Sequence, residues 1–164
     1  MILEFTKVNE NAVTPTRSNP SDAGLDLYAS IPETLDHEST VMSRTILIRP
    51  GGNQMIPTGL RFGIPHGYML QVCNRSGMGA KRSLIVGAHI IDSGYDGEVF
   101  IDLHNIGLGP QVVRHGEKIA QVVLIPIIHF RPRENTSGLL YEEQDLAMSN
   151  RGTGALGSTD NKGV

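Results

Sequence analysis

Residues 87–104 read GAHIIDSGYDGEVFIDLH and combine two tight turns with one alternating strand. Ser93-Gly94 and Asp96-Gly97 are sequences typical of turns, because glycine tolerates a positive φ and the aspartate side chain can hydrogen-bond to the backbone of the turn. From Val99 to Leu103 an aliphatic residue occupies every second position, which places these side chains on one face of a strand. The stretch predicts a hairpin that leads into a half-buried strand.

The same pattern extends in both directions along the chain. Short runs rich in Val, Ile and Leu alternate with turn-forming residues, and the sequence contains 19 glycines and 9 prolines. No long segment repeats apolar residues at the spacing of a helix, so we predict an all-β chain. Strands are expected at residues 2–8, 45–49, 55–62, 68–73, 98–104 and 118–128.

The chain has 164 residues, a size typical of one domain, and a formal net charge of −3. That charge does not attract nucleic acid or an anionic membrane, so a phosphate-bearing partner must be bound by a few placed residues, as a nucleotide would be. Cys73 is the only cysteine, and neither a signal sequence nor an apolar run of membrane length is present. We therefore expect a cytoplasmic protein that binds neither nucleic acid nor membrane.

The apolar pattern ends after residue 130. We therefore predict a β-domain over residues 1–130 and an arm over residues 131–164 that crosses something outside its own core. Within the arm, residues 151–160 read RGTGALGSTD. Glycines let backbone N–H groups turn toward an anion, hydroxyls add donors, and an arginine matches phosphate oxygens, so this segment is suited to wrap a phosphate. The alternative is a disordered terminus.

Several upstream residues admit a functional and a structural interpretation. Asp92 can be a simple turn residue, or a carboxylate held on a rigid hairpin as a base for one water molecule. Arg75 and Ser76 follow an apolar strand in a glycine-rich turn, which can face an anion or only solvent. Gln121 lies in an apolar run and needs a hydrogen-bond partner. Asp26, between two leucines, has the pattern of a solvated outward face.

The four segments that contain these residues, together with residues 151–160, resemble the five motifs of the trimeric dUTPase family in order and spacing. They are Ala23–Ala29 (AGLDLYA), Arg75–Gly79 (RSGMG), Gly87–Gly97 (GAHIIDSGYDG) and Gly116–Gln121 (GEKIAQ). The resemblance implies a distorted jelly-roll barrel of the dUTPase-like β-clip type with an extended C-terminal arm. It also implies a homotrimer in which all three chains build each active site and the arm closes over it.

The resemblance further implies Mg²⁺-dependent hydrolysis of dUTP to dUMP and pyrophosphate by attack of water on the α-phosphorus. Asp92 matches the family's general base, and Tyr95 matches the tyrosine that packs under the deoxyribose. Asp26 matches an aspartate that holds the Mg²⁺ through water. The backbone of a hairpin at Ile85–Ile90 is expected to pair with uracil. The other positions matched to substrate binding are Arg75, Ser76, Gly77, His89, Gln121, Arg151, Leu156, Gly157, Ser158 and Thr159.

Some positions depart from the family pattern. Leu156 stands where a phenylalanine usually stacks on uracil, and Asn74 stands where proline is frequent. The residues at positions 89 and 102 instead resemble those of the related dCTP deaminases, which use a glutamate near the position of Asp102. At Ala80, however, those enzymes have an arginine. The alternatives are therefore a dCTP deaminase or a bifunctional enzyme of the same fold, and a weakly catalytic nucleotide-binding module that acts through a protein partner.

Overall fold

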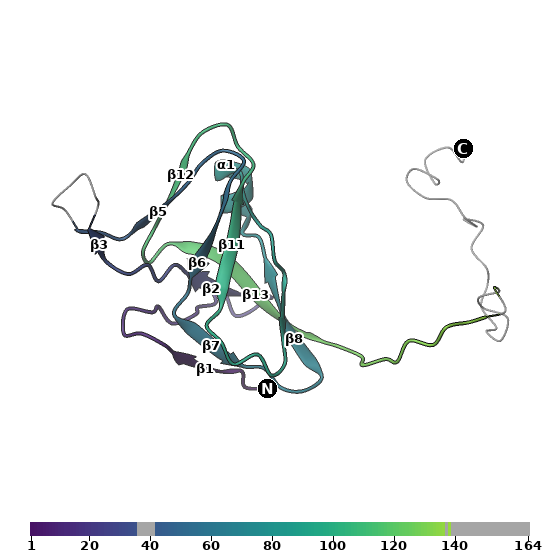
Figure 1. Ribbon diagram of the computed structural model, residues 1–164. Coiled ribbons are helices and arrows are strands. Elements are labelled where there is room, and N and C mark those ends of the chain that lie inside the picture. Colours follow the sequence, from purple (N-terminus) through teal and green to yellow (C-terminus); the bar gives the residue numbers. More distant parts are fainter. Residues whose placement is uncertain (36–41, 137, 139–164) are drawn as a thin grey trace. The chain divides into compact units, whose positions relative to one another are not determined.

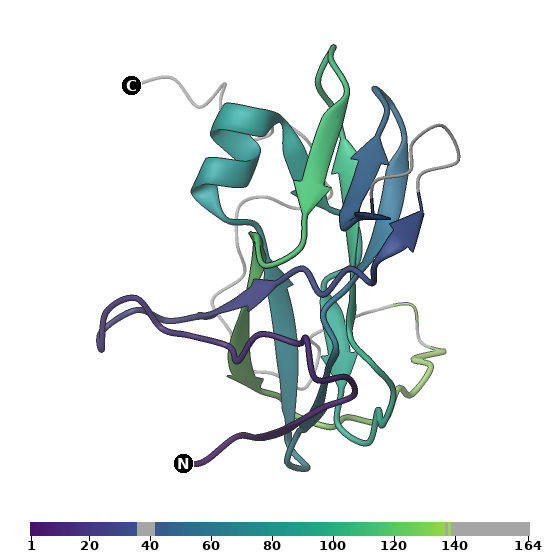
Figure 2. The same cartoon turned by 90° about the vertical axis from the view of Figure 1, so that its left-hand side faces the viewer.

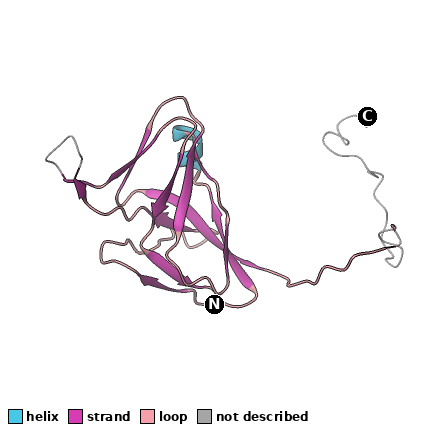
Figure 3. Ribbon diagram, in the orientation of Figure 1, coloured by secondary structure: helices cyan, strands magenta, loops and turns pink. Residues whose placement is uncertain are grey.

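The computed structural model describes residues 1–35, 42–136 and 138 (Figure 1). This part of the chain consists of strands and turns with one short helix, α1 (Ser76–Arg82) (Figure 3). The strands are β1 (Glu4–Lys7), β2 (Leu25–Tyr28), β3 (Thr34–Leu35), β4 (Met42–Ser43), β5 (Thr45–Ile48), β6 (Asn53–Pro57), β7 (Leu60–Gly63), β8 (Tyr68–Cys73), β9 (Leu84–Val86), β10 (Ile90–Asp92), β11 (Phe100–Asn105), β12 (Gln111–Arg114) and β13 (Lys118–Pro126). The prediction of an all-β chain is confirmed. Among the described residues, no helix is long and apolar enough to cross a membrane.

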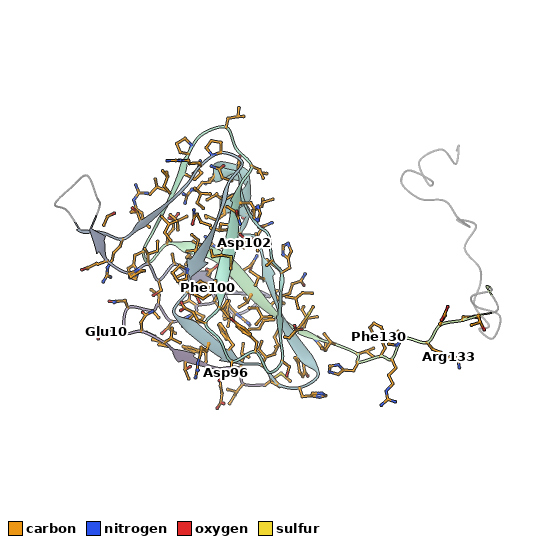
Figure 4. All side chains as sticks on the ribbon, in the orientation of Figure 1. Glu10, Asp96, Phe100, Asp102, Phe130 and Arg133 are labelled. Atoms are coloured by element: carbon orange, nitrogen blue, oxygen red, sulfur yellow. The ribbon has the colours of Figure 1, made fainter. Side chains whose placement is uncertain are left out.

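The chain divides into two units, Met1–His129 and Phe130–Val164. In the first unit a four-stranded sheet has the order β10-β8-β13-β2, and a three-stranded sheet has the order β6-β11-β9. The pairs β1-β7, β12-β5 and β3-β4 complete it, and all pairings are antiparallel. Figure 2 shows these strands around a common interior, which side chains fill (Figure 4). Neighbouring strands come from distant parts of the sequence, so the sheets bring separate motifs together.

One apolar core lies between the two larger sheets. Leu27 and Leu70 of the four-stranded sheet and Ile101 and Leu103 of the three-stranded sheet are all at most 1% exposed and belong to the same cluster. Along β11 burial alternates as the sequence predicts, since Ile101 and Leu103 are buried and the residues between them are not. Phe100 and Asp102, both labelled in Figure 4, accordingly lie on the opposite face of β11 from Ile101 and Leu103.

The predicted strand over residues 55–62 is in fact two strands that belong to different sheets, because β6 pairs with β11 whereas β7 pairs with β1. The break falls at Thr58-Gly59, where Gly59 has a φ of +69°. The Thr58 hydroxyl donates to the carbonyl of Val99 at 2.6 Å, and the Gly59 N–H donates to Glu98 Oε1 at 2.7 Å. These contacts satisfy the polar groups at the corner, which the sequence pattern could not reveal.

The two hairpins predicted around residues 85–104 are also wrong. β10 pairs with β8, whereas β9 and β11 pair with each other in the other sheet. The turns on either side of β10 therefore cross between the two sheets. Local turn chemistry correctly predicted the turn at Ser93-Gly94, whereas Asp96-Gly97 forms only a bend. The partner of each strand is set by the packing of the whole core.

Residues 76–82 form α1, where the sequence predicted a glycine-rich turn. Two glycines lower the helix propensity of this segment, and only Met78 is buried. Tertiary contacts stabilise the helix: Arg82 donates to Gln111 Oε1 at 3.0 Å and to the carbonyl of Val112 at 2.7 Å, and it forms an ion pair with Glu117. Ser83, in the left-handed conformation with a φ of 52°, ends the helix.

Candidate active site

A polar pocket lies where β2, β13 and the beginning of α1 meet. It is lined by Ser18, Asp22, Gly24, Asp26, Arg75, Ser76 and Gln121. The sheet register explains the gathering, because Gln121 on β13 pairs with Asp26 on β2 and with Cys73 at the end of β8. The chain after β8 then delivers Arg75 and Ser76 to the same place. The structure thus brings together four of the predicted site residues.

Asp26 is the centre of an ion-pair network in the polar pocket. Its Oδ1 accepts a hydrogen bond from Arg75 Nε at 2.9 Å, and its Oδ2 lies 2.7 Å from Lys118 Nζ. Burial raises the pKa of the Asp26 carboxyl, but the hydrogen bond from Lys118 and the charges of Arg75 and Lys118 outweigh it and hold this pKa below its ordinary value. Because the side chain is only 12% exposed, the pattern of a solvated outward face is wrong here.

Asp26→Asn is expected to change how stability responds to acid. The pKa of Asp26 is lower in the folded protein than in the unfolded chain, so its stabilising contribution is complete above about pH 4 and is lost as the pH falls through the folded-state pKa. Asparagine does not titrate and leaves two cations without a counter-charge. The variant should be less stable than the wild type at neutral pH and should lose less stability on acidification. Thermal unfolding from about pH 7 to pH 2 tests this. Wild-type and variant melting curves that shift in parallel over that range would contradict it.

Gln121 has the partner that the sequence required. Its Nε2 donates to the backbone carbonyl of Asn74 at 3.0 Å. A Cβ added to Gly24 would lie 2.7 Å from Gln121 Oε1, so a glycine at this position gives the amide its room. By contrast, a Cβ added to Gly77 would meet no atom within 4 Å, and packing therefore does not require that glycine.

A second, apolar pocket lies between the end of β10 and the beginning of β11. It is lined by Met55, Ile90, Ile91, Asp92, Tyr95, Glu98, Val99 and Phe100. Asp92, the last residue of β10, is exposed and supplies the pocket with a carboxylate. Tyr95 is 49% exposed, and its hydroxyl donates to the carbonyl of Glu98 at 2.9 Å, which fixes the ring at the pocket wall. The other lining residues are mainly aliphatic and aromatic, and the Glu98 carboxylate already accepts from the Gly59 N–H, so the pocket suits a ligand that is only partly polar.

The two pockets are separated on the four-stranded sheet. Asp92 pairs with Met69 on one side of β8, whereas Gln121 pairs with Cys73 on the other side. Four residues along a strand span roughly 13 Å, and two strand spacings add roughly 10 Å across the sheet. A single chain therefore does not place Asp92 beside the groups of the polar pocket.

The loop Gly87–His89 connects the two sheets and is fastened at both ends. The Gly87 N–H donates to the carbonyl of Asp102 at 2.9 Å, and the His89 carbonyl accepts from the Val72 N–H at 2.8 Å. The His89 ring nitrogen Nδ1 also lies 2.8 Å from the Val72 carbonyl. Within the part of the chain that the structure describes, the peptide groups of Ala88 have no hydrogen-bond partner. They are therefore free to bind a planar ligand edge.

Asp102 packs against the Gly87 end of this loop. Its carboxylate accepts from Asn53 Nδ2 at 2.8 Å and lies 2.9 Å from His104 Nε2. A Cβ added to Gly87 would lie 2.5 Å from Asp102 Oδ2, so glycine permits the close approach. Burial raises the pKa of the Asp102 carboxyl, but the hydrogen bonds from Asn53 and His104 outweigh burial and lower this pKa.

The structure also places in the site Lys118, which the sequence did not single out, and Asn74, which the sequence marked only as a departure from the family pattern. Strand alternation would place Lys118 and Gln121 on opposite faces, but a register shift between Lys118 and Ala120 brings both to Asp26. The predicted binding residues of the arm, namely Arg151, Leu156, Gly157, Ser158 and Thr159, lie outside the described residues.

A guanidinium, a hydroxyl and an amide converge on one polar pocket, and groups of this kind can donate hydrogen bonds to phosphate oxygens. The dUTPase family matches residues 10–159 of this chain. The chain therefore belongs to the dUTPase family.

Individual proteins agree with this assignment. The deoxyuridine 5'-triphosphate nucleotidohydrolase of Gloeobacter violaceus is 37% identical over 147 residues, which cover 88% of this chain and 87% of that protein. The enzyme of the same name from Chlamydia pneumoniae is 33% identical over 157 residues, which cover 94% of this chain and 96% of that protein. The structure of the Staphylococcus bacteriophage 80α dUTPase with dUPNHPP has a TM-score of 0.76 at 24% identity and covers 96% of this chain and 98% of that one. The expected dUTPase-like fold is confirmed.

Proposed function

We propose that this chain hydrolyses dUTP to dUMP and pyrophosphate by attack of water on the α-phosphorus. The match of the dUTPase family to residues 10–159 carries the proposal. Relatives that are similar over most of their length bear the name of this activity. The lone Cys73 fits a reducing compartment, and we place the protein in the cytoplasm.

In this proposal the polar pocket binds the triphosphate. Arg75 uses Nε for Asp26 and Nη1 for the carbonyl of Lys118, at 2.9 and 3.2 Å, and its remaining N–H groups are available to phosphate oxygens. The Ser76 hydroxyl and the Gln121 amide line the same pocket and add donors, and Gly77 follows Ser76 in α1.

The residues of the polar pocket fit a Mg²⁺ ion that is held mainly by the substrate. Among the described residues, no group of three His, Cys, Asp or Glu side chains could enclose a metal ion. Mg²⁺ needs no such cage, because it keeps several waters and binds phosphate oxygens beside one or two carboxylates. Asp26 accepts from Arg75, Lys118 and more distantly Ser18, which leaves one of about four lone pairs for a metal-bound water. The ion would neutralise charge on the triphosphate.

The apolar pocket and its neighbouring loop bind the nucleoside, and the pocket also provides the general base. Asp92 removes a proton from the attacking water, and Tyr95 packs under the deoxyribose where a 2′-hydroxyl would not fit. The free peptide groups of Ala88, beside His89, pair with the uracil edge. An edge of alternating donors and acceptors is what a planar pyrimidine offers.

A homotrimer with shared active sites is part of the proposal. The separation of the two pockets on one chain supports it, because a base that acts at the α-phosphorus must lie close to the groups that bind the phosphates. Neighbouring chains would supply Asp92 and the polar pocket to one site. Arg151, Leu156, Gly157, Ser158 and Thr159 of the arm would then cover the substrate and exclude water other than the nucleophile.

The state of Asp102 disfavours the alternative of a dCTP deaminase. A proton shuttle works best with a pKa near the working pH. The contacts from Asn53 and His104 instead lower the pKa of Asp102 and engage both of its carboxylate oxygens. Asp102 therefore acts as support for the loop Gly87–His89 rather than as an acid or base.

Assays with dUTP, dCTP, dTTP and UTP in the presence of Mg²⁺ test the proposed function. Cytosine reverses the donor and acceptor pattern of uracil at two positions, and each mismatch costs about 1–3 kcal/mol, so kcat/KM should be at least tenfold lower for dCTP than for dUTP. We expect pyrophosphate from dUTP and no ammonia from dCTP. Ammonia that disappears in Asp102→Ala would favour the deaminase, and tight binding without turnover would favour the regulatory module.

A further inference from the structure

Asn74 contacts both halves of the proposed site. Its side-chain Oδ1 accepts a hydrogen bond from the Val86 N–H at 2.7 Å, and its backbone carbonyl accepts from Gln121 Nε2 at 3.0 Å. Val86 is only 4% exposed, so its N–H group has little access to water and depends on that oxygen. Asn74 itself is exposed, and replacing it removes no buried apolar surface.

The position of the base-reading loop, Gly87–His89, depends on this contact. Val86 is the last residue of β9, which pairs with β11, whereas β10 after the loop pairs with β8. The end of β8 therefore holds the loop at two points, through Val72 at His89 and through Asn74 at Val86. Val72 uses its backbone, which any residue provides. Asn74 uses its side chain, so this anchor belongs to the particular sequence.

We propose that Asn74 is a positioning residue that sets the base-reading loop in register with the phosphate-binding groups and thereby sharpens the choice of base. The proposal rests on the proposed function of the two pockets. Asn74 holds Gln121 through its backbone carbonyl and Val86 through its side chain. Loss of the side chain would release the loop and leave the contact with Gln121 in place.

Two substitutions separate these roles. Asn74→Ala removes the acceptor oxygen, whereas Asn74→Asp keeps an acceptor at the same place, and both retain the carbonyl that binds Gln121. In Asn74→Ala we expect the Val86 amide of the nucleotide-free protein to exchange with D₂O at least tenfold faster, and the ratio of kcat/KM for dUTP to that for dCTP to fall about tenfold. Pyrophosphate binding should stay within about twofold in Asn74→Ala, since the phosphate groups are untouched.

The ratio is the decisive number for Asn74→Asp, because the added charge affects both triphosphates alike. That variant should keep the wild-type ratio. Asn74→Ala with wild-type Val86 exchange and wild-type ratio would overturn the proposal, as would Asn74→Asp with the ratio of the alanine variant.

In the nucleotide-free wild type, the Val86 amide should also exchange more slowly than the unpaired Ala88 amide, and equal rates would overturn the proposal even if Asn74→Ala does not fold. This measurement needs no turnover. A wild-type protein that does not hydrolyse dUTP would instead remove the proposed function alone.

Discussion

Asp92→Asn is expected to lower kcat for dUTP by roughly 10²- to 10⁴-fold, the range that a general base contributes, while dUTP binding changes little. The amide keeps the shape of the carboxylate and can still hydrogen-bond to water, but it cannot take a proton. Asp92 is exposed at the end of β10, so the substitution removes no core packing. Pyrophosphate release under single-turnover conditions and titration with a non-hydrolysable dUTP analogue measure the two effects separately.

Asp96→Asn is the matched control for this variant. Asp96 lies in the same connection between β10 and β11, and its side chain is 88% exposed and 3.5 Å from Arg61. The control removes the same charge from the same turn without touching the proposed base, and it should retain wild-type turnover. Wild-type turnover in Asp92→Asn, or an equal loss in Asp96→Asn, would mean that Asp92 is not the base.

Deletion of residues 150–164 is expected to abolish most dUTP hydrolysis and to leave a folded trimer. The deleted segment is polar and rich in glycine, and Met1–His129 forms a compact unit of its own. Without the segment, the bound triphosphate would lose donors and its protection from bulk water. Light scattering and pyrophosphate release test the two parts of the prediction. A monomeric truncated protein would contradict the first part, and undiminished activity would contradict the second.

Mixed trimers provide a sharper test of the shared site. The truncated chain keeps Asp92 and lacks the arm segment, whereas the full-length Asp92→Asn chain has the segment and lacks the base. If different chains supply the base and the arm to one site, co-refolding the two inactive proteins should restore part of the activity. Mixing that restores nothing would indicate that each chain builds its own site.

Much of the fold follows from local features of the sequence. The alternation from Val99 to Leu103 predicts which side chains of β11 enter the core, because successive residues of a strand point to opposite faces wherever the strand lies. The turn residues predict where strands end, and the order of the motifs identifies the family. The same local chemistry cannot predict α1, because its two glycines disfavour a helix and the contacts that stabilise it run from Arg82 to Gln111 and Val112 on another strand.

The partners of strands and side chains are decided only in the tertiary structure. The register shift in β13 brings Lys118 to Asp26, and the end of β8 places Asn74 against Val86. Both contacts join residues from different strands, and they exist because burial of the common core fixes how distant strands lie against one another. The sequence by itself determined the β-structure, the inward-facing residues of β11 and the family. The packing of the whole unit decided that two separate pockets form and which side chains hold them in place.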